Sequence, residues 1–237
     1  MRKTTEPPGR RDPSDCTLCA TRFACVASRI PAGDMPLVQP LIRKRSVLRG
    51  DVLAREGEVA NAVRVLKVGS AFGYRRGLDG RTRPVGIAGR GAPFGMFGVF
   101  GQRTQLSAVA ASAARVCEIP AGTLRELSAR DAALSDYLAG AAVESCGRIA
   151  AWSEAMRVRG VTNQLAYSLL LLAEAQATPV IELPTHVALA ELLGTTRETV
   201  ARGLATLEEE GAIRRGERKN CEIHRGPLLG RLNRQPS

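Results

Sequence analysis

Three cysteines lie close together near the start of the chain, in the pattern C-x2-C-x5-C formed by Cys16, Cys19 and Cys25. A fourth candidate, Cys117, lies far downstream. Thiolates are soft ligands, so this spacing suits zinc or an iron–sulfur cluster. Three clustered sulfurs and one distant sulfur would close a four-thiolate site and fix the N-terminal segment to a folded domain. Free or redox-active thiols explain the spacing equally well, because structural zinc sites usually have two short pairs and this chain has one.

The composition indicates what kind of protein must position these sulfurs. The chain has 237 residues, of which 44% are hydrophobic, so it can build one large domain or two small ones around a core. It contains no run of about 18 apolar residues, and its polar start lacks the apolar core of a signal peptide. We therefore expect a cytoplasmic protein with reduced cysteines. The net charge of +11 favours a polyanionic partner such as nucleic acid.

The first half of the chain has the pattern of a β-domain that follows the cysteine-bearing segment. We assign residues 1–35 to that segment and residues 36–130 to a domain of short strands, such as those around Val63 and Val65. Leu78-Asp79-Gly80-Arg81 predicts a hairpin turn, because Asp-Gly tolerates the positive φ that such turns need. Many short strands with Gly-rich turns predict a barrel or sandwich, here a jelly roll.

A long helix is expected over residues 131–159, which contain no proline. Along it, five residues follow one another at alternating steps of three and four, which is coiled-coil spacing. Such a stripe can pack against the helix's own domain. With a barrel before it and another domain after it, we favour dimerisation through this seam, which consists of Leu138, Ala141, Ser145, Arg148 and Trp152.

Residues 160–237 are predicted to form a winged helix-turn-helix. Within 185–213, a helix is followed by a turn at Gly194 and by a second helix that is capped by Thr195 or Thr196. A plain helical hairpin would show the same pattern. The second helix, however, begins with residues that can read base edges, namely Arg197, Glu198, Ala201 and Arg202. A basic wing that could contact phosphates follows, with Arg214, Arg215, Arg218 and Lys219.

In this order of elements the chain resembles the CRP/FNR family of bacterial transcription regulators. The resemblance implies an α+β fold with a jelly-roll sensor domain of the cyclic-nucleotide-binding type, a long dimerisation helix and a winged helix-turn-helix. Arg197-Glu-Thr-Val-Ala-Arg202 resembles the recognition helix of the family, and Val161-Thr162 resembles its hinge region. The cysteine pattern, with the lone Cys117 in Val-Cys-Glu-Ile-Pro, resembles the oxygen-sensing FNR branch.

The resemblance to that branch implies a [4Fe–4S] cluster held by Cys16, Cys19, Cys25 and Cys117. The protein would then be a homodimeric regulator that senses oxygen or redox state, with the cluster controlling dimerisation and binding to a palindromic promoter in double-stranded DNA. We also expect RNA polymerase as a partner.

Two further features concern ligand and DNA specificity. Cyclic-nucleotide-binding members carry a Glu and an Arg-Ser pair in the barrel, whereas this chain has Gly95-Met96-Phe97 and Thr104-Gln-Leu-Ser107 there. No cyclic nucleotide is therefore expected. In the recognition helix, Ala201 stands where the FNR branch has Ser. Gly203 stands where an apolar residue is expected, at a cost of about 1 kcal/mol in helix propensity relative to Ala.

Two other classes of function remain open at this point. One is a regulator that uses the same cysteines as a zinc site or a thiol switch. The other is an iron–sulfur electron carrier without specific DNA binding. An enzyme is not expected, because the sequence offers no nucleophile–base–acid set and no phosphate-binding glycine loop.

Overall fold

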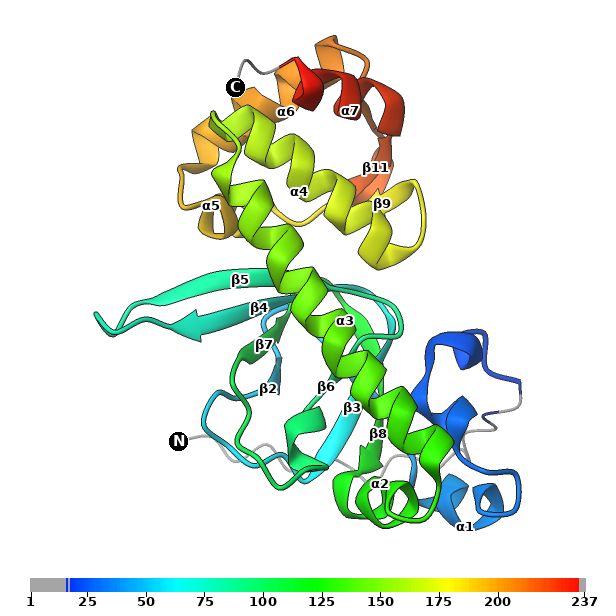
Figure 1. The fold of residues 1–237 in the computed structure, drawn as a ribbon. Coiled ribbons are helices and arrows are strands. Elements are labelled where there is room, and N and C mark those ends of the chain that lie inside the picture. The colour runs from blue at the N-terminus through cyan, green and yellow to red at the C-terminus, as the bar shows by residue number, and fades with distance from the viewer. Residues whose placement is uncertain (1–15, 17, 235–237) are drawn as a thin grey trace, which may run out of the picture.

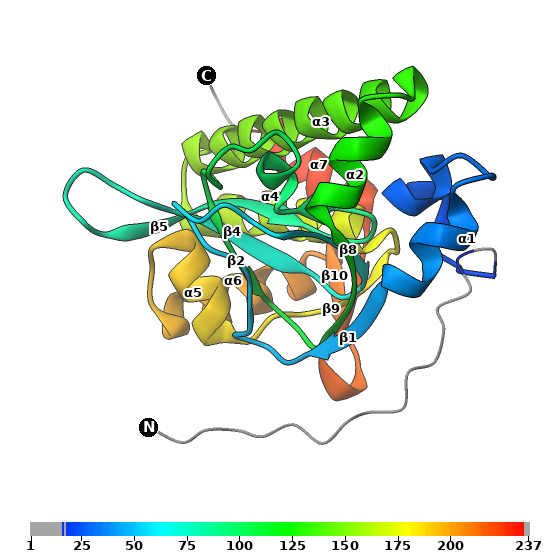
Figure 2. The same ribbon diagram turned by 90° about the horizontal axis from the view of Figure 1, so that it is seen from below.

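The computed structural model describes residue 16 and residues 18–234. Figure 1 shows a β-domain and a C-terminal helical domain that are joined by the long helix α3. In Figure 2 the N-terminal segment lies on one flank of the β-domain, while α3 lies across that domain. Among the described residues, no helix is both long and apolar enough to span a bilayer.

The N-terminal segment is built from short helical turns rather than strands. Its elements are η1 (Arg22–Ala24), η2 (Val26–Arg29), α1 (Met35–Val38) and η3 (Gln39–Leu41). Val26, Ala27 and Ile30 are buried in this segment. They share a core with Val63 of the β-domain and Leu138 of α3, so the segment is packed onto both.

The β-domain consists of two four-stranded antiparallel sheets, in the orders β1-β8-β3-β6 and β2-β7-β4-β5. Leu53, Leu66 and Val116 are buried between the two sheets. The predicted jelly roll is therefore confirmed. The strands are β1 Arg43–Val47, β2 Val52–Ala54, β3 Ala62–Val68, β4 Ala71–Arg76, β5 Thr82–Ala88, β6 Pro93–Phe94, β7 Ser107–Ala110 and β8 Ala114–Pro120.

The β4–β5 hairpin turns where the sequence predicts it. Gly80 has a φ of +75° at the tip. The backbone N–H of Gly77 donates to the carbonyl of Arg81 at 2.8 Å and closes the loop. Gly80 supplies the positive φ that residues with a side chain rarely adopt. The hairpin extends away from the β-domain (Figure 1).

Two helices follow β8, the last strand of the β-domain. The short helix α2 (Ala121–Ser128) leads into α3 (Ala132–Arg157), which lies within the predicted range 131–159. Asp131 caps α3, because its carboxylate accepts a hydrogen bond from the N–H of Leu134 at 2.6 Å. Such a cap satisfies one of the N–H groups that a helix leaves without a partner at its start.

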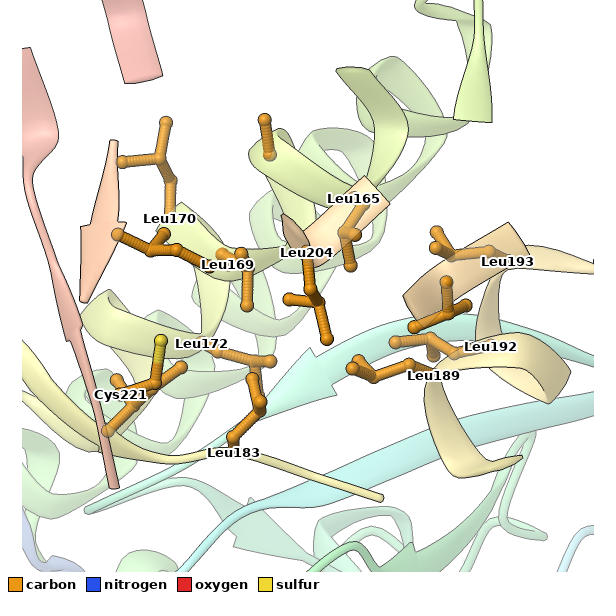
Figure 3. Close-up of a cluster of buried hydrophobic side chains, with 14 of the residues drawn as sticks. Leu165, Leu169, Leu170, Leu172, Leu183, Leu189, Leu192, Leu193, Leu204 and Cys221 are labelled. Atoms are coloured by element: carbon orange, nitrogen blue, oxygen red, sulfur yellow. The ribbon is translucent and has the colours of Figure 1, made fainter. Parts of the chain in front are cut away.

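The C-terminal domain is a three-stranded sheet, in the order β10-β11-β9, packed with helices. Its core is rich in leucine, with Leu165 and Leu169 of α4 facing Leu189 and Leu204 (Figure 3). The order of elements is that of a winged helix-turn-helix. They are α4 Val161–Gln176, β9 Val180–Glu182, α5 His186–Leu193, α6 Arg197–Glu209, β10 Ile213–Arg215, η5 Glu217–Lys219, β11 Asn220–Ile223 and α7 Arg225–Asn233.

The two domains also share apolar contacts. Phe72 and Ile87 of the β-domain and Trp152 of α3 belong to the same buried cluster as the leucines of the C-terminal domain. The β-domain and the C-terminal domain are therefore in direct contact, as well as connected through α3.

Candidate four-cysteine site and nucleic-acid interface

The four predicted cysteines lie around one small pocket. Cys16, Cys19 and Cys25 come from the N-terminal segment, and Cys117 comes from β8. Cys25 and Cys117 are buried, whereas Cys16 and Cys19 are half-buried. Since β8 pairs with both β1 and β3, Cys117 is held on a rigid strand while the other three sulfurs approach it from the segment. The fold therefore brings together residues that are far apart in the sequence.

The environment of the pocket affects each thiol differently. Burial, together with the neighbouring sulfurs, raises the pKa of Cys25 to about 11, and burial also raises the pKa of Cys117. Burial also tends to raise the pKa of Cys19. Hydrogen bonds from the Thr21 backbone and the Lys67 side chain outweigh this effect, so the pKa of Cys19 is lowered. Lys67 thus places a cation beside the Cys19 thiol.

The four cysteines offer soft sulfur donors, which suit both zinc and iron–sulfur clusters. Among the described residues, no three His, Cys, Asp or Glu side chains are arranged to hold one metal ion. A single zinc ion binds sulfur at about 2.3 Å and therefore needs its thiolates close to one another. In a [4Fe–4S] cluster each thiolate binds a different iron atom, so four cysteines that line one pocket can serve as its ligands.

The pocket lies next to the start of α3. Tyr137 of α3 donates a hydrogen bond to the carbonyl of Ala24 at 3.4 Å, and the guanidinium of Arg29 lies 5.3 Å from the centre of the Tyr137 ring. Ala27, from the same segment as the three cysteines, packs in one core with Leu134 of α3. Any movement of the cysteine segment therefore acts directly on the long helix.

The predicted dimer seam on α3 faces its own subunit instead. Leu138, Ala141 and Trp152 are exposed by 0%, 6% and 3%, and the Trp152 indole N–H donates to the carbonyl of Pro84 at 3.1 Å. Ser145 is bonded within the helix to the carbonyl of Ala141 and accepts from Arg148. The three apolar residues of the predicted seam therefore pack α3 within its own subunit, which leaves the exposed side of the helix for a partner.

The opposite face of α3 is exposed and apolar, and the sequence analysis missed it. Val143 is 71% exposed and Ile149 is 37% exposed. Exposed small residues, Ala139, Ala142, Cys146 and Ala150, surround them, and small side chains permit a close approach by another helix. The same three- and four-residue spacing runs along this face and could have indicated it. Its members are Ala139, Ala142, Val143, Cys146, Ile149 and Ala150.

The recognition helix α6 begins as predicted. Thr196 is its cap, with its hydroxyl accepting from the N–H of Thr199 at 3.2 Å, while Thr195 lies in the turn before it. Gly194 adopts the left-handed conformation that the turn requires, with a φ of +62°. At the other end of the domain, α4 begins at Val161, with Thr162 as its second residue.

The residues that could read bases lie on the open side of α6. Arg197, Glu198 and Arg202 are exposed, and Ala201 is half-buried between them. The Arg202 guanidinium donates to the Thr199 hydroxyl at 3.3 Å, which orients it along the helix surface. The first two turns of α6 therefore present two guanidinium groups and one carboxylate to solvent.

The presence of glycine at position 203 is explained by its contacts with another helix. A Cβ at this position would be 3.0 Å from Cδ2 of Leu165 and 3.6 Å from the hydroxyl of Thr162, both on α4. Gly203 is buried at this crossing. The glycine therefore lets α6 pack closely on α4, which offsets its poor helix propensity.

The basic residues of the wing differ in whether a carboxylate of the same domain pairs with them. Arg214 pairs with Glu222, and Arg215 pairs with Glu208, so both are held by carboxylates of their own domain. Lys219 is exposed at the tip and has a φ of +71°. The side chain of Arg218 lies outside the described part of the structure. Exposed Lys219 is thus better suited to a phosphate contact than either paired arginine.

Comparison with known proteins agrees with this arrangement. Residues 44–131 match the cyclic nucleotide-binding domain family, and residues 163–232 match the Crp-like helix-turn-helix domain family. The two matches occur in the order expected for a regulator with a sensor and a DNA-reading domain. The chain belongs to the CRP/FNR family of transcriptional regulators. It is therefore a DNA-binding regulator of transcription.

Individual relatives of this CRP/FNR regulator are distant. The chain is 26% identical to the "Cyclic AMP receptor protein" of Thermus thermophilus over 198 residues, which covers 83% of this chain and 90% of that protein. It is 25% identical to a "Probable transcriptional activator" of Rhizobium leguminosarum bv. viciae, over 85% of this chain and 86% of the relative. The structure of FixK2 from Bradyrhizobium japonicum has the same fold, with a TM-score of 0.70 at 20% identity over 83% of this chain and 99% of that one.

Proposed function

We propose that this regulator senses oxygen or redox state through a [4Fe–4S] cluster held by Cys16, Cys19, Cys25 and Cys117. The observation that carries the proposal is that all four cysteines line one pocket, although Cys117 comes from a strand far from the other three. Thiols must lose their protons to bind a metal as thiolates, and Lys67 beside Cys19 favours that loss. When bound, the cluster would supply a redox-sensitive bond between the segment and β8.

The chain's own residues would transmit the state of this site to α3. Ala27 and Ile30 pack with Leu134 and Leu138, so an anchored segment fixes the first half of α3. A released segment exposes those apolar side chains and lets the helix move. A bound group shifts such an equilibrium only through its different affinities for the two arrangements. The proposal therefore requires tighter binding of the cluster to the dimer-competent state.

Dimerisation would use the exposed face of α3 around Val143 and Ile149. Two copies related by a two-fold axis would pair these faces and place their α6 helices about 34 Å apart, one turn of B-DNA. A palindromic promoter site in double-stranded DNA is the matching target. RNA polymerase is the partner expected once the dimer is on the promoter.

At each half-site, α6 would enter the major groove by its first turns. Arg202 and Glu198 would read a C·G pair, with Arg donating to guanine O6 and N7 and Glu accepting from cytosine N4. Arg197 would contact a second guanine. Lys219 of the wing would add a phosphate contact, which strengthens binding to any sequence.

The test is anaerobic purification followed by iron and sulfide assays on the wild type and on C117S, C25S and C146S. We expect about four irons and four sulfides per chain, lost in C117S and C25S and retained in C146S, because Cys146 lies on the exposed face of α3. DNA binding should weaken after exposure to air in the wild type. Cyclic AMP should change neither the iron and sulfide content nor the DNA binding.

Other results would favour the other functions. A colourless protein with one zinc per chain would indicate that the four cysteines form a zinc site and not a cluster site. Iron-loaded protein that fails to select any palindrome from a promoter library would indicate an electron carrier. A metal-free protein whose DNA binding still responds to oxidants would indicate a thiol switch.

A further inference from the structure

A short loop between β5 and β6 joins the cysteine segment to the DNA-binding domain. The loop is Gly89-Arg90-Gly91. The backbone N–H of Arg90 donates to the carbonyl of Ala175, near the end of α4, at 2.8 Å. Its guanidinium donates to the carbonyl of Ala20, one residue after Cys19. One residue of the β-domain therefore holds both the segment and the DNA-binding domain.

The glycines on either side allow these two contacts. A Cβ on Gly89 would lie 1.9 Å from the carbonyl oxygen of Ala175, closer than any side chain can approach a backbone atom. A Cβ on Gly91, whose φ is +85°, would lie 2.6 Å from the Cβ of Ala24 and 2.9 Å from its carbonyl oxygen. Each glycine thus lets the loop backbone press against one partner.

The contact with Ala175 completes a helix end. A helix leaves its last four carbonyls without partners inside the helix, and α4 ends at Gln176. The N–H of Arg90 satisfies one of those carbonyls from another domain. Gly203 of α6 packs against Thr162 and Leu165 near the start of α4, so α4 connects the Arg90 contact at one end with the recognition helix at the other.

We propose that the loop Gly89–Gly91 is a relay that carries the state of the cysteine segment to the DNA-binding domain, with Arg90 as its positioning residue. The relay rests on the proposed four-cysteine site. It differs from the dimerisation route because it runs along β5–β6 and α4 within one subunit. Release of the segment removes the hold on Arg90 from Ala20, and the loop then supports the end of α4 less firmly.

The experiment separates the relay from dimerisation by using two copies of the chain joined by a flexible linker. Such a tethered dimer binds DNA without a monomer–dimer step. The affinity for a palindromic site is measured with the protein iron-loaded and after iron removal, in wild type, R90A and G89A. The matched controls are R81A, on the exposed hairpin, and G86A. A Cβ on Gly86 would meet no atom of the described residues within 4 Å.

We expect iron removal to weaken DNA binding about fivefold or more in the tethered wild type and in both controls, a change within the usual range for coupled sites. In R90A the iron-loaded and iron-free proteins should bind within twofold of each other. G89A should behave likewise if it folds. Hydrogen exchange of the amides at 177 and 178 should rise on iron removal in the wild type and stay constant in R90A.

Two failures can be told apart. If no iron is bound, the proposed iron–sulfur site is wrong, and the relay that rests on it is wrong as well. If iron is bound but R90A keeps the wild-type change in DNA affinity and in hydrogen exchange, the relay alone is overturned.

Discussion

At the scale of single residues, the DNA contact depends on a few exposed side chains of α6. Arg202 donates to Thr199 and keeps its guanidinium at the surface, where a bidentate pair with guanine can form. By contrast, Arg214 of the wing is already paired with Glu222. The two arginines therefore differ in what they are free to recognise.

This difference gives the first prediction. R202A should lose about 1–3 kcal/mol of discrimination at one base pair of each half-site, because a bidentate contact is removed. R214A should change affinity little, and equally for all sequences. Binding to a set of sites that each differ from the best one by one base pair measures both effects. Uniform weakening by R202A on every site would instead identify Arg202 as a phosphate contact.

Cys221 gives a second prediction, on pH. It is buried in β11, and burial raises its pKa from 9.0 to about 11. The folded state then holds the thiol proton more tightly than the unfolded state does. The stability this contributes is fully present below pH 9 and is lost as pH rises towards 11. At pH 10.5 the loss is about 2 kcal/mol.

C221A lacks this titration, so its free energy of unfolding should fall less between pH 8 and pH 10.5 than that of the wild type. Other groups titrate in both proteins and cancel in the difference. Urea unfolding at the two pH values measures it. An equal fall in both proteins would mean that the thiol of Cys221 titrates in the folded protein as it does in the unfolded chain.

Some of these residues could be predicted from the sequence and others could not. The cysteine spacing and the Thr196 cap are local patterns, and the structure places those residues as the patterns suggest. The reason for Gly203 could not be found locally, because it lies in Leu165 of another helix. The pairing of Arg215 with Glu208 is equally non-local, since it joins the wing to α6.

At the scale of elements, α3 shows where pattern reasoning stops. Its alternating three- and four-residue stripe predicts a packing face, but the spacing alone does not identify the surface against which that face packs. Leu138 and Trp152 meet their own β-domain, because the jelly roll offers them an apolar face first. The second stripe, with Val143 and Ile149, is less apolar, so its spacing predicts a packing face less strongly.

The third prediction tests this second face. The double variant V143E and I149E should be monomeric at concentrations where the iron-loaded wild type is a dimer, because charges on both copies would be buried against each other. Analytical ultracentrifugation under anaerobic conditions measures the change. The matched control is A133E, an exposed residue at the start of the same helix.

Cys146 provides an independent check of the same face. If two α3 helices pair in parallel through it, the two Cys146 thiols lie close together near the two-fold axis. Mild oxidation should then crosslink the iron-loaded wild type into a covalent dimer, and C146S should not crosslink. A double variant that still sedimented as a dimer would place the interface elsewhere on the molecule.

At the scale of the whole molecule, the contacts form a connected path from the thiols to the recognition helix. The cysteine segment packs on α3 through Ala27 and holds Arg90 through Ala20. The backbone N–H of Arg90 donates to the carbonyl of Ala175 near the end of α4, and α4 crosses α6 at Gly203. The path is made of tight backbone approaches and buried side chains, which shift between discrete arrangements rather than deform smoothly.

The fourth prediction follows from the reciprocity of coupled binding sites. If the occupied cysteine site increases affinity for promoter DNA by some factor, promoter DNA must increase the affinity of that site for its bound group by the same factor. A coupling of about 1–3 kcal/mol corresponds to a change of about 5- to 150-fold. At equilibrium with a competing iron chelator, the protein on its palindromic site should therefore keep more iron than the free protein. A scrambled duplex of the same length and charge serves as control, because it supplies phosphates without the base contacts of Arg202. Equal iron retention with the palindrome, the scrambled duplex and no DNA would show that the cysteine site and the recognition helix are not coupled, however closely Arg90 connects them.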